Sequence, residues 1–481
     1  MKRAGRLPFA RRRLLQGACA LAASSWPRSA SAAPPPGQGE VATAVRQLLR
    51  YERFTLASGL EVLLHDDPKA TQVAVNVRYH VGSKDEEPGR TGFAHLFEHL
   101  LFQGSKHVGE DRFFRYLEEV GAVGVNGTTS HDRTNYYETV PAAHRDLALW
   151  LESDRMGFLL DHLSEATFEG QRKVVKNELR ERFETAPYGA AYLTAVGALY
   201  PPGHPYHHTP IGSHADLDAA TAEEAKRFFL RYYTPANARL VLAGALGPGV
   251  RAAVERYFGT LPSRPKPATV RTPQPSPLTR DVRLRVEAGV ELPRLFVAWS
   301  TPVYATADDP RLDVLATVLA SGDEAVLHRR LVRDTELATA VEASQGSGII
   351  AGVFTIEAPL TRGRDPRRAL AVLDDALRRL AEQGPTAAEV EAAKAKLTLQ
   401  DLASLELVGR RAESLNLYAD VAGDPTYLAT VLEQYQAVTP ESLRDAARRL
   451  LFRRPRVALL TSPKAKAPVA GVVTGREEVA L

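Results

Sequence analysis

The chain has 481 residues, which is too many for one typical hydrophobic core, so its length predicts roughly two to four domains. Its composition, 44% hydrophobic and 25% charged, is that of an ordinary globular protein. The single cysteine, Cys19, excludes an intrachain disulfide and a cysteine-rich zinc site, so any metal must be held by His, Asp or Glu.

Residues 1–32 predict a signal peptide of the twin-arginine type. They include Arg11-Arg12-Arg13, then a modestly apolar stretch, and end in the small-residue cleavage pattern Ala30-Ser31-Ala32. We therefore expect a periplasmic or secreted protein; the alternative is a basic leader that does not direct export. Removing this segment takes away seven positive charges and lowers the formal net charge from +4 to −3, which argues against a nucleic-acid partner. No later apolar run approaches the roughly 20 residues needed to span a bilayer.

The next region, residues 45–262, predicts a mixed α+β domain. Alternating apolar residues are typical of strands at 53–56, 60–65, 73–79 and 134–140. Apolar residues at helical spacing predict helices at 92–103, 111–120, 144–160 and 168–184.

A proline-rich segment, residues 263–279, predicts an interdomain linker, because such a segment does not fit a packed sheet. In residues 280–465 the order of elements restarts, with a strand at 295–300, helices at 311–319 and 324–333, and a strand at 353–358. The stretch that ends at Gly104 resembles the one that ends at Gly322, an offset of 218 residues. We interpret this as a duplication, although a chance match between two helices is the alternative.

The strongest chemical signal is the sequence His95-Leu96-Phe97-Glu98-His99. On a helix, His95 and His99 project from one face one turn apart, and two imidazoles at that spacing can bind one zinc ion. Glu98 lies beside them and could act as a general base toward water. At the offset of 218, this set falls on Asp313, Ala316 and Thr317, so we predict one metal site and not two.

Three segments together resemble the pitrilysin/insulinase family of zinc metallopeptidases: "HLFEHLLFQG", residues 121–141 and residues 171–189. The resemblance extends over roughly residues 54–460 and is strongest to the shorter bacterial members, which are similar to mitochondrial processing peptidase subunits. It implies the α+β class, with two homologous α/β-roll domains, each an antiparallel-rich sheet with helices on one face. It also implies a zinc endopeptidase for extended or unfolded peptides.

The resemblance assigns roles to particular residues. One Zn²⁺ per chain would be held by His95, His99 and Glu178, with Glu98 as the general base. Composition alone does not single out Glu178, because Glu169, Glu181 and Glu184 share its predicted helix; these three are expected to be solvated or ion-paired. A second glutamate that many members carry is replaced by Gln171, which puts the support of the ligands in doubt.

Asn126 matches the family asparagine on an edge strand that holds the substrate backbone, while a turn asparagine beside Gly127 is an equal alternative. The histidines of "HPYHH", which are His204, His207 and His208, are interpreted as solvated loop residues and not as a second metal site.

The second half lacks an arginine–tyrosine pair that self-sufficient family members use to hold substrate. Thr339 stands where the tyrosine would be, although Arg329, Arg330 and Arg333 are nearby. This departure predicts a homologous, metal-free partner chain that supplies the pair, or a homodimer. The rival hypothesis from another class is a non-catalytic structural or binding subunit.

Overall fold

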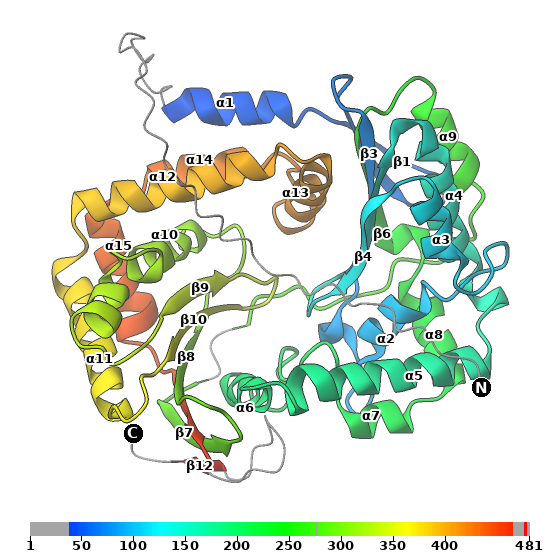
Figure 1. Ribbon diagram of the computed structural model, residues 1–481. Helices are drawn as coiled ribbons and strands as arrows, with labels where there is room; N and C mark the ends of the chain where they lie inside the picture. The colour runs from blue at the N-terminus through cyan, green and yellow to red at the C-terminus, as the bar shows by residue number, and fades with distance from the viewer. Residues whose placement is uncertain (1–37, 275–277, 465–475, 479–481) are drawn as a thin grey trace, which may run out of the picture. The chain divides into compact units, whose positions relative to one another are not determined.

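The computed structural model describes residues 38–274, 278–464 and 476–478, so the predicted signal peptide lies outside the described residues. Two six-stranded sheets divide this part of the chain into a first half, with β1 to β6, and a second half, with β7 to β12 (Figure 1). No helix in these ranges is both long and apolar enough to cross a membrane.

The first sheet has the order β1-β2-β6-β3-β5-β4. Strands β2 and β6 are parallel, and the other neighbours are antiparallel. The strands, in that order, are Glu52–Thr55, Glu61–Asp66, Ala238–Gly244, Gln72–Tyr79, Thr134–Pro141 and Val123–Thr129.

The second sheet has the order β12-β7-β11-β8-β10-β9 and repeats this pattern, with β7 and β11 as the parallel pair. Its strands, in that order, are Arg476–Glu478, Val282–Ala288, Val457–Pro463, Arg294–Thr301, Gly352–Pro359 and Glu342–Gly346. The predicted fold class, α+β with two homologous domains, is confirmed. The boundaries 45–262, 263–279 and 280–465 remain a prediction.

Helices cover the sheets in both halves. Those before the linker are α1 (Gln38–Leu48), α2 (Phe93–Leu100), α3 (Arg112–Glu119), α4 (Arg145–Phe158), α5 (Glu165–Leu179), α6 (Gly189–Leu199), α7 (His214–Ala219), α8 (Ala222–Tyr232) and α9 (Val250–Phe258). Those after it are α10 (Asp309–Ala320), α11 (Pro366–Gln383), α12 (Ala387–Ser404), α13 (Val408–Val421), α14 (Leu428–Gln436) and α15 (Pro440–Ala446).

Local sequence explains where several helices begin. The Thr221 hydroxyl accepts a hydrogen bond from the backbone amide of Glu224, and the Glu224 carboxylate accepts one from the backbone amide of Thr221. Thr386 and Glu389 repeat this arrangement at α12. The predicted helix 324–333 begins two residues later than expected, and most of it is not α-helical. Its end is a π-helical segment, His328–Arg333, in which the amide of Asp334 donates to the carbonyl of Arg329, five residues back.

The two halves meet through polar contacts. Helix α13 packs against β3 and β6, and Figure 1 shows it beside β3. The Asn76 amide donates to Glu413 over 2.8 Å, and Arg78 Nε lies 3.2 Å from an Asp420 oxygen. Helix α1 packs on α14, with an ion pair between Arg46 and Glu433. One face of the first sheet is therefore covered in part by helix α13 of the second half.

Candidate metal centre

Helix α2 carries the HxxEH sequence and is fixed at its first turn. The Glu86 carboxylate accepts hydrogen bonds from the backbone amides of Gly92, over 2.9 Å, and Ala94, over 2.8 Å, which lie at the N-terminus of α2. His208 Nε2 lies 3.0 Å from the same carboxylate. The apolar side of α2, which includes Phe93, Leu96, Phe97 and Leu100, is buried against the first sheet and its helices.

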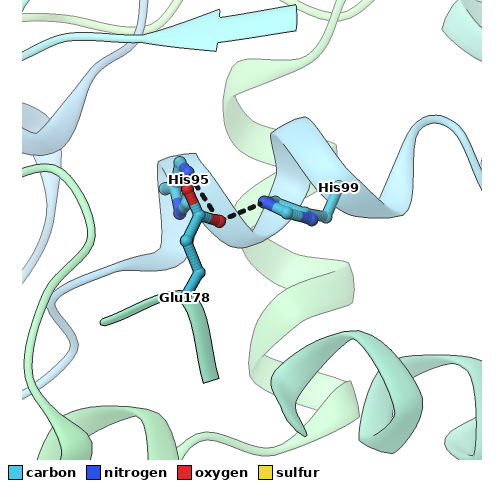
Figure 2. A group of neighbouring side chains, drawn as sticks. All are labelled: His95, His99 and Glu178. Atoms are coloured by element: carbon cyan, nitrogen blue, oxygen red, sulfur yellow. Dashed lines mark ion pairs between the residues drawn. The ribbon is translucent and has the colours of Figure 1, made fainter. Parts of the chain in front are cut away.

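The structure brings His95, His99 and Glu178 together, although Glu178 lies on a different helix, α5 (Figure 2). Their potential ligand atoms all lie within 4.8 Å of one another. Glu178 Oε2 is 3.1 Å from His99 Nε2 and 3.8 Å from His95 Nε2. The other Glu178 oxygen lies 2.9 Å from Arg182 Nε. One carboxylate oxygen is thus held by Arg182, and the other faces both imidazoles.

The protonation states suit a metal. Burial lowers the pKa of His95 to about 4, so its imidazole is neutral near pH 7 and offers a lone pair. Burial alone would raise the pKa of Glu178, but a hydrogen bond from His99 and the fields of His95 and Arg182 outweigh it, so its pKa is lowered. Two imidazoles and one carboxylate form a common catalytic zinc ligand set. Because these three donors lie within 4.8 Å of one another and match that set, the residues fit zinc.

Glu98 projects from α2 toward β4 and not into this ligand group. Its carboxylate accepts a hydrogen bond from the Thr129 hydroxyl over 2.6 Å. Burial raises the pKa of Glu98, and the bond from Thr129 opposes this rise. Gly127 leaves room for Glu98, because a Cβ at Gly127 would lie 2.8 Å from Glu98 Cγ. Sequence reasoning assigned no contact with Glu98 to Gly127 or Thr129; their only signal is that they follow Asn126 on the same strand.

Asn126 lies exposed on β4, which is the edge strand of the first sheet and is paired with β5 on one side. Its side-chain oxygen accepts a hydrogen bond from the Gly127 amide over 3.0 Å. The position suits pairing with an extended peptide, and the local bond is of the kind that turn asparagines make. Both interpretations of Asn126 therefore stay open.

The other glutamates near Glu178 lie outside the ligand group. Glu169 forms an ion pair with Arg172 and Glu184 one with His214, while Glu181 is exposed. Within the described ranges, the group of His95, His99 and Glu178 is the one set of three or more His, Cys, Asp or Glu side chains placed to hold a metal.

The "HPYHH" histidines form hydrogen bonds in the structure. His207 Nδ1 lies 2.5 Å from the Tyr200 carbonyl, and His204 stacks on the Tyr200 ring. His208 contacts Glu86, which holds the start of α2. The expectation that these side chains are simply solvated is therefore wrong for His207 and His208, because backbone and carboxylate acceptors face them across the loop.

In the second half, the three arginines considered for substrate binding are engaged within the chain. Arg329 pairs with Glu389, Arg330 with Asp375 and Arg333 with Glu324. The Thr339 amide donates to the Pro359 carbonyl over 2.9 Å.

Comparisons with family models and with known proteins point to the same family. Residues 61–190 match the family model described as insulinase (peptidase family M16), and residues 219–397 match the one described as peptidase M16 inactive domain. The zinc protease PqqE of Helicobacter pylori is 31% identical over 296 residues, which cover 61% of this chain and 66% of that protein. The uncharacterized zinc protease YmxG of Bacillus subtilis is 24% identical over 417 residues, 87% of this chain and 99% of YmxG.

A solved structure, that of a protease from Helicobacter pylori, superposes with a TM-score of 0.79 at 27% identity and covers 86% of this chain and 99% of that one. Matches to both family models, to relatives along most of the chain and to this structure agree with the HxxEH sequence on α2. The chain therefore belongs to the M16 peptidase family.

Proposed function

We propose that the protein is a zinc-dependent endopeptidase that hydrolyses extended or unfolded peptides. The observation that carries the proposal is the convergence of His95, His99 and Glu178 within 4.8 Å, with the Glu98 carboxylate on the same helix. When bound, zinc would polarise the scissile carbonyl and make water more acidic. His95, His99 and Glu178 would hold the ion.

Glu98 acts as the general base. Its carboxylate takes a proton from the attacking water and then delivers it to the leaving amine. The rise in the pKa of Glu98 through burial suits both steps, because a more basic carboxylate accepts a proton more readily near neutral pH. The hydrogen bond from Thr129 keeps one oxygen of Glu98 oriented.

The substrate backbone pairs with the open edge of β4 in this proposal, and Asn126 lies at that edge. Strand pairing recognises main-chain groups, so it requires an extended peptide and excludes a folded segment.

We also propose that the chain works beside a homologous, metal-free partner chain that supplies the missing arginine–tyrosine pair, or as a homodimer. The internal ion pairs of Arg329, Arg330 and Arg333 support a partner, since these arginines are already engaged. The twin-arginine pattern in residues 1–32 supports export to the periplasm or the medium.

A non-catalytic structural or binding subunit is the second candidate. The observation that favours it is the match of residues 219–397 to the inactive-domain model. This match lies outside the segment that carries His95, His99 and Glu178, so it weighs less than the ligand group in the first half.

The test measures zinc content and cleavage of a quenched, unstructured peptide for the wild type, Glu98→Gln and the exposed control Glu118→Gln on α3. We expect one zinc in all three, with cleavage lowered by about 10²–10⁴-fold only in Glu98→Gln. Zinc in all three without cleavage in any would point to the partner chain, whose addition should then restore activity. Absence of zinc from the wild type would favour the binding subunit.

A further inference from the structure

None of the ligand or catalytic roles proposed above uses the histidine loop, residues 204–208, which lies between α6 and α7. The end of this connection packs tightly against the residues before α2. A Cβ at Gly92 would lie 2.8 Å from the Ile211 carbonyl oxygen, and one at Gly212 would lie 2.5 Å from the Thr91 carbonyl oxygen. Movement of the α6–α7 connection would therefore displace the start of the helix that carries His95 and His99.

Helix α2 begins without an ordinary capping side chain. The residue before it, Gly92, has a left-handed φ of 95° and offers no side-chain acceptor. The first amides of a helix lack partners within the helix and need acceptors from elsewhere. One oxygen of the Glu86 carboxylate accepts from the Ala94 amide over 2.8 Å, and the other accepts from the Gly92 amide over 2.9 Å. Glu86 thus does for α2 what a capping residue does for other helices.

Glu86 requires a cation in this position. Its side chain is 0% exposed, and a buried carboxylate is costly unless it is paired. His208 Nε2 lies 3.0 Å from the Glu86 oxygen that accepts from Gly92, and equally close to the Ser83 carbonyl oxygen. Among the residues that the structure describes, His208 is the one basic side chain paired with this carboxylate. The histidine loop is thus connected through Glu86 to the first turn of α2.

The groups that face His208 favour its charged form. Burial alone would lower the pKa of His208, but the hydrogen bond and field of Glu86, together with the field of Asp216, outweigh it, so its pKa is raised. On the other side, His131 Nε2 lies 3.0 Å from the His208 carbonyl oxygen. Burial lowers the pKa of His131 to about 4, so this ring is neutral near pH 7. The His208 imidazole therefore keeps its proton at pH values at which a free histidine has lost it.

The other charged side chains of this region have partners of their own. Lys84 pairs with Asp85, the Asp132 carboxylate accepts from the Tyr206 hydroxyl, and Asp216 accepts from the Thr91 amide. His208 is therefore the titratable group that sets the charge beside Glu86 near and above neutral pH.

The turn that Glu86 holds leads directly into the ligand group. Ala94 precedes His95, and His99 follows one turn later on the same helix. Glu178 comes from α5, so its separation from the two imidazoles depends on where α2 stands. A functional site requires its groups to be held within about 0.5 Å of the productive geometry. A loose first turn of α2 would therefore weaken the metal centre without any change in its ligands.

We propose that His208 is a positioning residue for the metal centre, because its imidazolium holds the Glu86 carboxylate on the first turn of α2 and so keeps the two histidine ligands in place. The inference rests on the proposed function, to which it adds a residue and a pH dependence. The stabilisation is complete below the ordinary histidine pKa of about 6.5 and is lost as pH rises through the raised pKa of His208 in the folded chain. Alkaline pH therefore releases the start of α2.

The test compares the wild type with His208→Gln, which keeps a hydrogen-bond donor but no charge, and with His208→Arg, which stays charged at every pH used. The matched control is His207→Gln, a change at the neighbouring histidine, whose Nδ1 lies 2.5 Å from the Tyr200 carbonyl oxygen. Competition with a chelator of known affinity measures zinc binding from about pH 6.5, the ordinary histidine pKa, to about pH 9. Thermal unfolding reports whether each variant folds.

Near pH 6.5, His208→Gln should bind zinc about tenfold more weakly than the wild type, the lower end of what loss of an outer-shell partner costs. This ratio should shrink toward one as pH rises, because the wild type then loses the same charge. Protonation of the ligands themselves is common to both proteins and cancels in the ratio. His208→Arg should match the wild type near neutral pH and bind zinc more tightly than the wild type at alkaline pH. His207→Gln should match the wild type throughout.

A merely structural role of His208 would give a ratio that does not change with pH, and this result would overturn the proposal. Equal zinc affinities of His208→Gln and the wild type at every pH would do the same. If His208→Gln does not fold, Glu86→Gln removes the same ion pair from its other side. Its zinc affinity relative to the wild type should also be lowest near neutral pH and recover as pH rises.

Amide hydrogen exchange in the zinc-free protein separates this inference from the proposed function. The amides of residues 92–96 should exchange about tenfold faster in His208→Gln than in the wild type near neutral pH, since exchange reports the local opening of this turn. His208→Arg should restore the wild-type rate. This result would support the positioning role even if the wild type cleaved no peptide. A wild type that binds zinc and cleaves peptides, with exchange and zinc affinity unchanged in His208→Gln, would refute the positioning role and leave the peptidase standing.

Discussion

Helices α2 and α10 follow equivalent strands, β3 and β8, in the two repeated sheets. They differ in the polar residues they carry: α2 has His95 and His99, and α10 has Asp313 and Thr317 at the equivalent positions. In α10, burial raises the pKa of Asp313 to about 8, so this side chain is largely protonated near pH 7, and Tyr435 hydrogen-bonds to it over 3.1 Å. Thr317 donates to the carbonyl of Asp313 within its own helix. At the offset of 218, Glu178 falls on Lys396, which cannot replace a carboxylate ligand. The second half keeps the packing and satisfies its polar groups locally.

A second contrast between the halves concerns buried residues that pack between a sheet and its helices. Glu138 of β5 and Glu152 and Arg155 of α4 are almost completely buried, at 2%, 1% and 2% exposure. At the same offset the second half has Ile356, Leu370 and Leu373, all in its hydrophobic core. The repeated topology thus forms with either set of residues. The three charged residues lie close to α2, the helix with the HxxEH sequence. Arg155 stacks on the ring of Tyr136, and the Tyr136 hydroxyl donates a hydrogen bond to the Phe97 carbonyl of α2.

The largest expected effect is on zinc binding and cleavage, when one of the ligands that distinguish α2 from α10 is removed. His99→Ala removes one of three ligands, and we expect zinc affinity to fall by more than about 100-fold, beyond what loss of an outer-shell partner costs. Cleavage should be lost with the metal. Thr317→Ala at the equivalent place in α10 is the matched control and should leave both unchanged. Zinc content after dialysis against a chelator of known affinity measures the change; retention of zinc by His99→Ala would remove His99 from the site.

The second contrast predicts a large loss of stability when the positive charge is removed from the buried charged group. Arg155→Leu leaves the buried Glu152 carboxylate without its ion-pair partner, beside Glu138, and we expect the free energy of unfolding to fall by about 3–5 kcal/mol. Chemical denaturation measures this change. Arg115→Leu, which removes an exposed ion pair with Glu119, should change stability by less than about 1 kcal/mol. A small effect of Arg155→Leu would mean that the two glutamates do not depend on it.

Replacing the buried charged residues of the first half by their counterparts in the second half should not lower the free energy of unfolding. The triple variant Glu138→Ile, Glu152→Leu and Arg155→Leu replaces the buried charges by the residues found at the same offset. We expect it to be neutral or more stable than the wild type by about 1–4 kcal/mol, because three desolvated groups become apolar contacts. If the triple variant were as unstable as Arg155→Leu alone, the two halves would not be interchangeable at this layer.

The sequence predicts those features that depend on near neighbours. The spacing of His95 and His99 places both imidazoles on one helical face, and family resemblance chooses Glu178 among several glutamates. The central strands β6 and β11 are not predicted, because each joins its sheet from far along the chain after several helices. Thr129 is missed for a similar reason: its bond to Glu98 depends on how β4 lies over α2, which no local pattern contains. A cavity lined by residues of both halves, among them Arg133 and Val353, is likewise visible only in the folded chain.

The smallest predicted effect is a difference in pH dependence caused by Glu138. Burial, together with the nearby Glu152, raises the pKa of Glu138 well above its ordinary value, while Arg155 opposes the rise. The folded protein therefore binds this proton at pH values where the unfolded chain has released it, so stability falls as pH rises above the unfolded pKa of about 4.3 toward the raised folded one. The slope from one such group is at most about 1.4 kcal/mol per pH unit.

Glu138→Gln keeps the shape of the protonated side chain and cannot ionise. We expect it to be close to the wild type in stability near pH 5 and increasingly more stable than the wild type as pH rises to 8, as measured by denaturation at each pH. Loss of zinc at acidic pH affects both proteins alike, so their difference isolates Glu138. Glu119→Gln, a change at an exposed glutamate, should run parallel to the wild type. Parallel curves for Glu138→Gln would show that Glu138 is ionised in the fold, and Arg155 would then have to balance two carboxylates at a place where the second half has three apolar side chains.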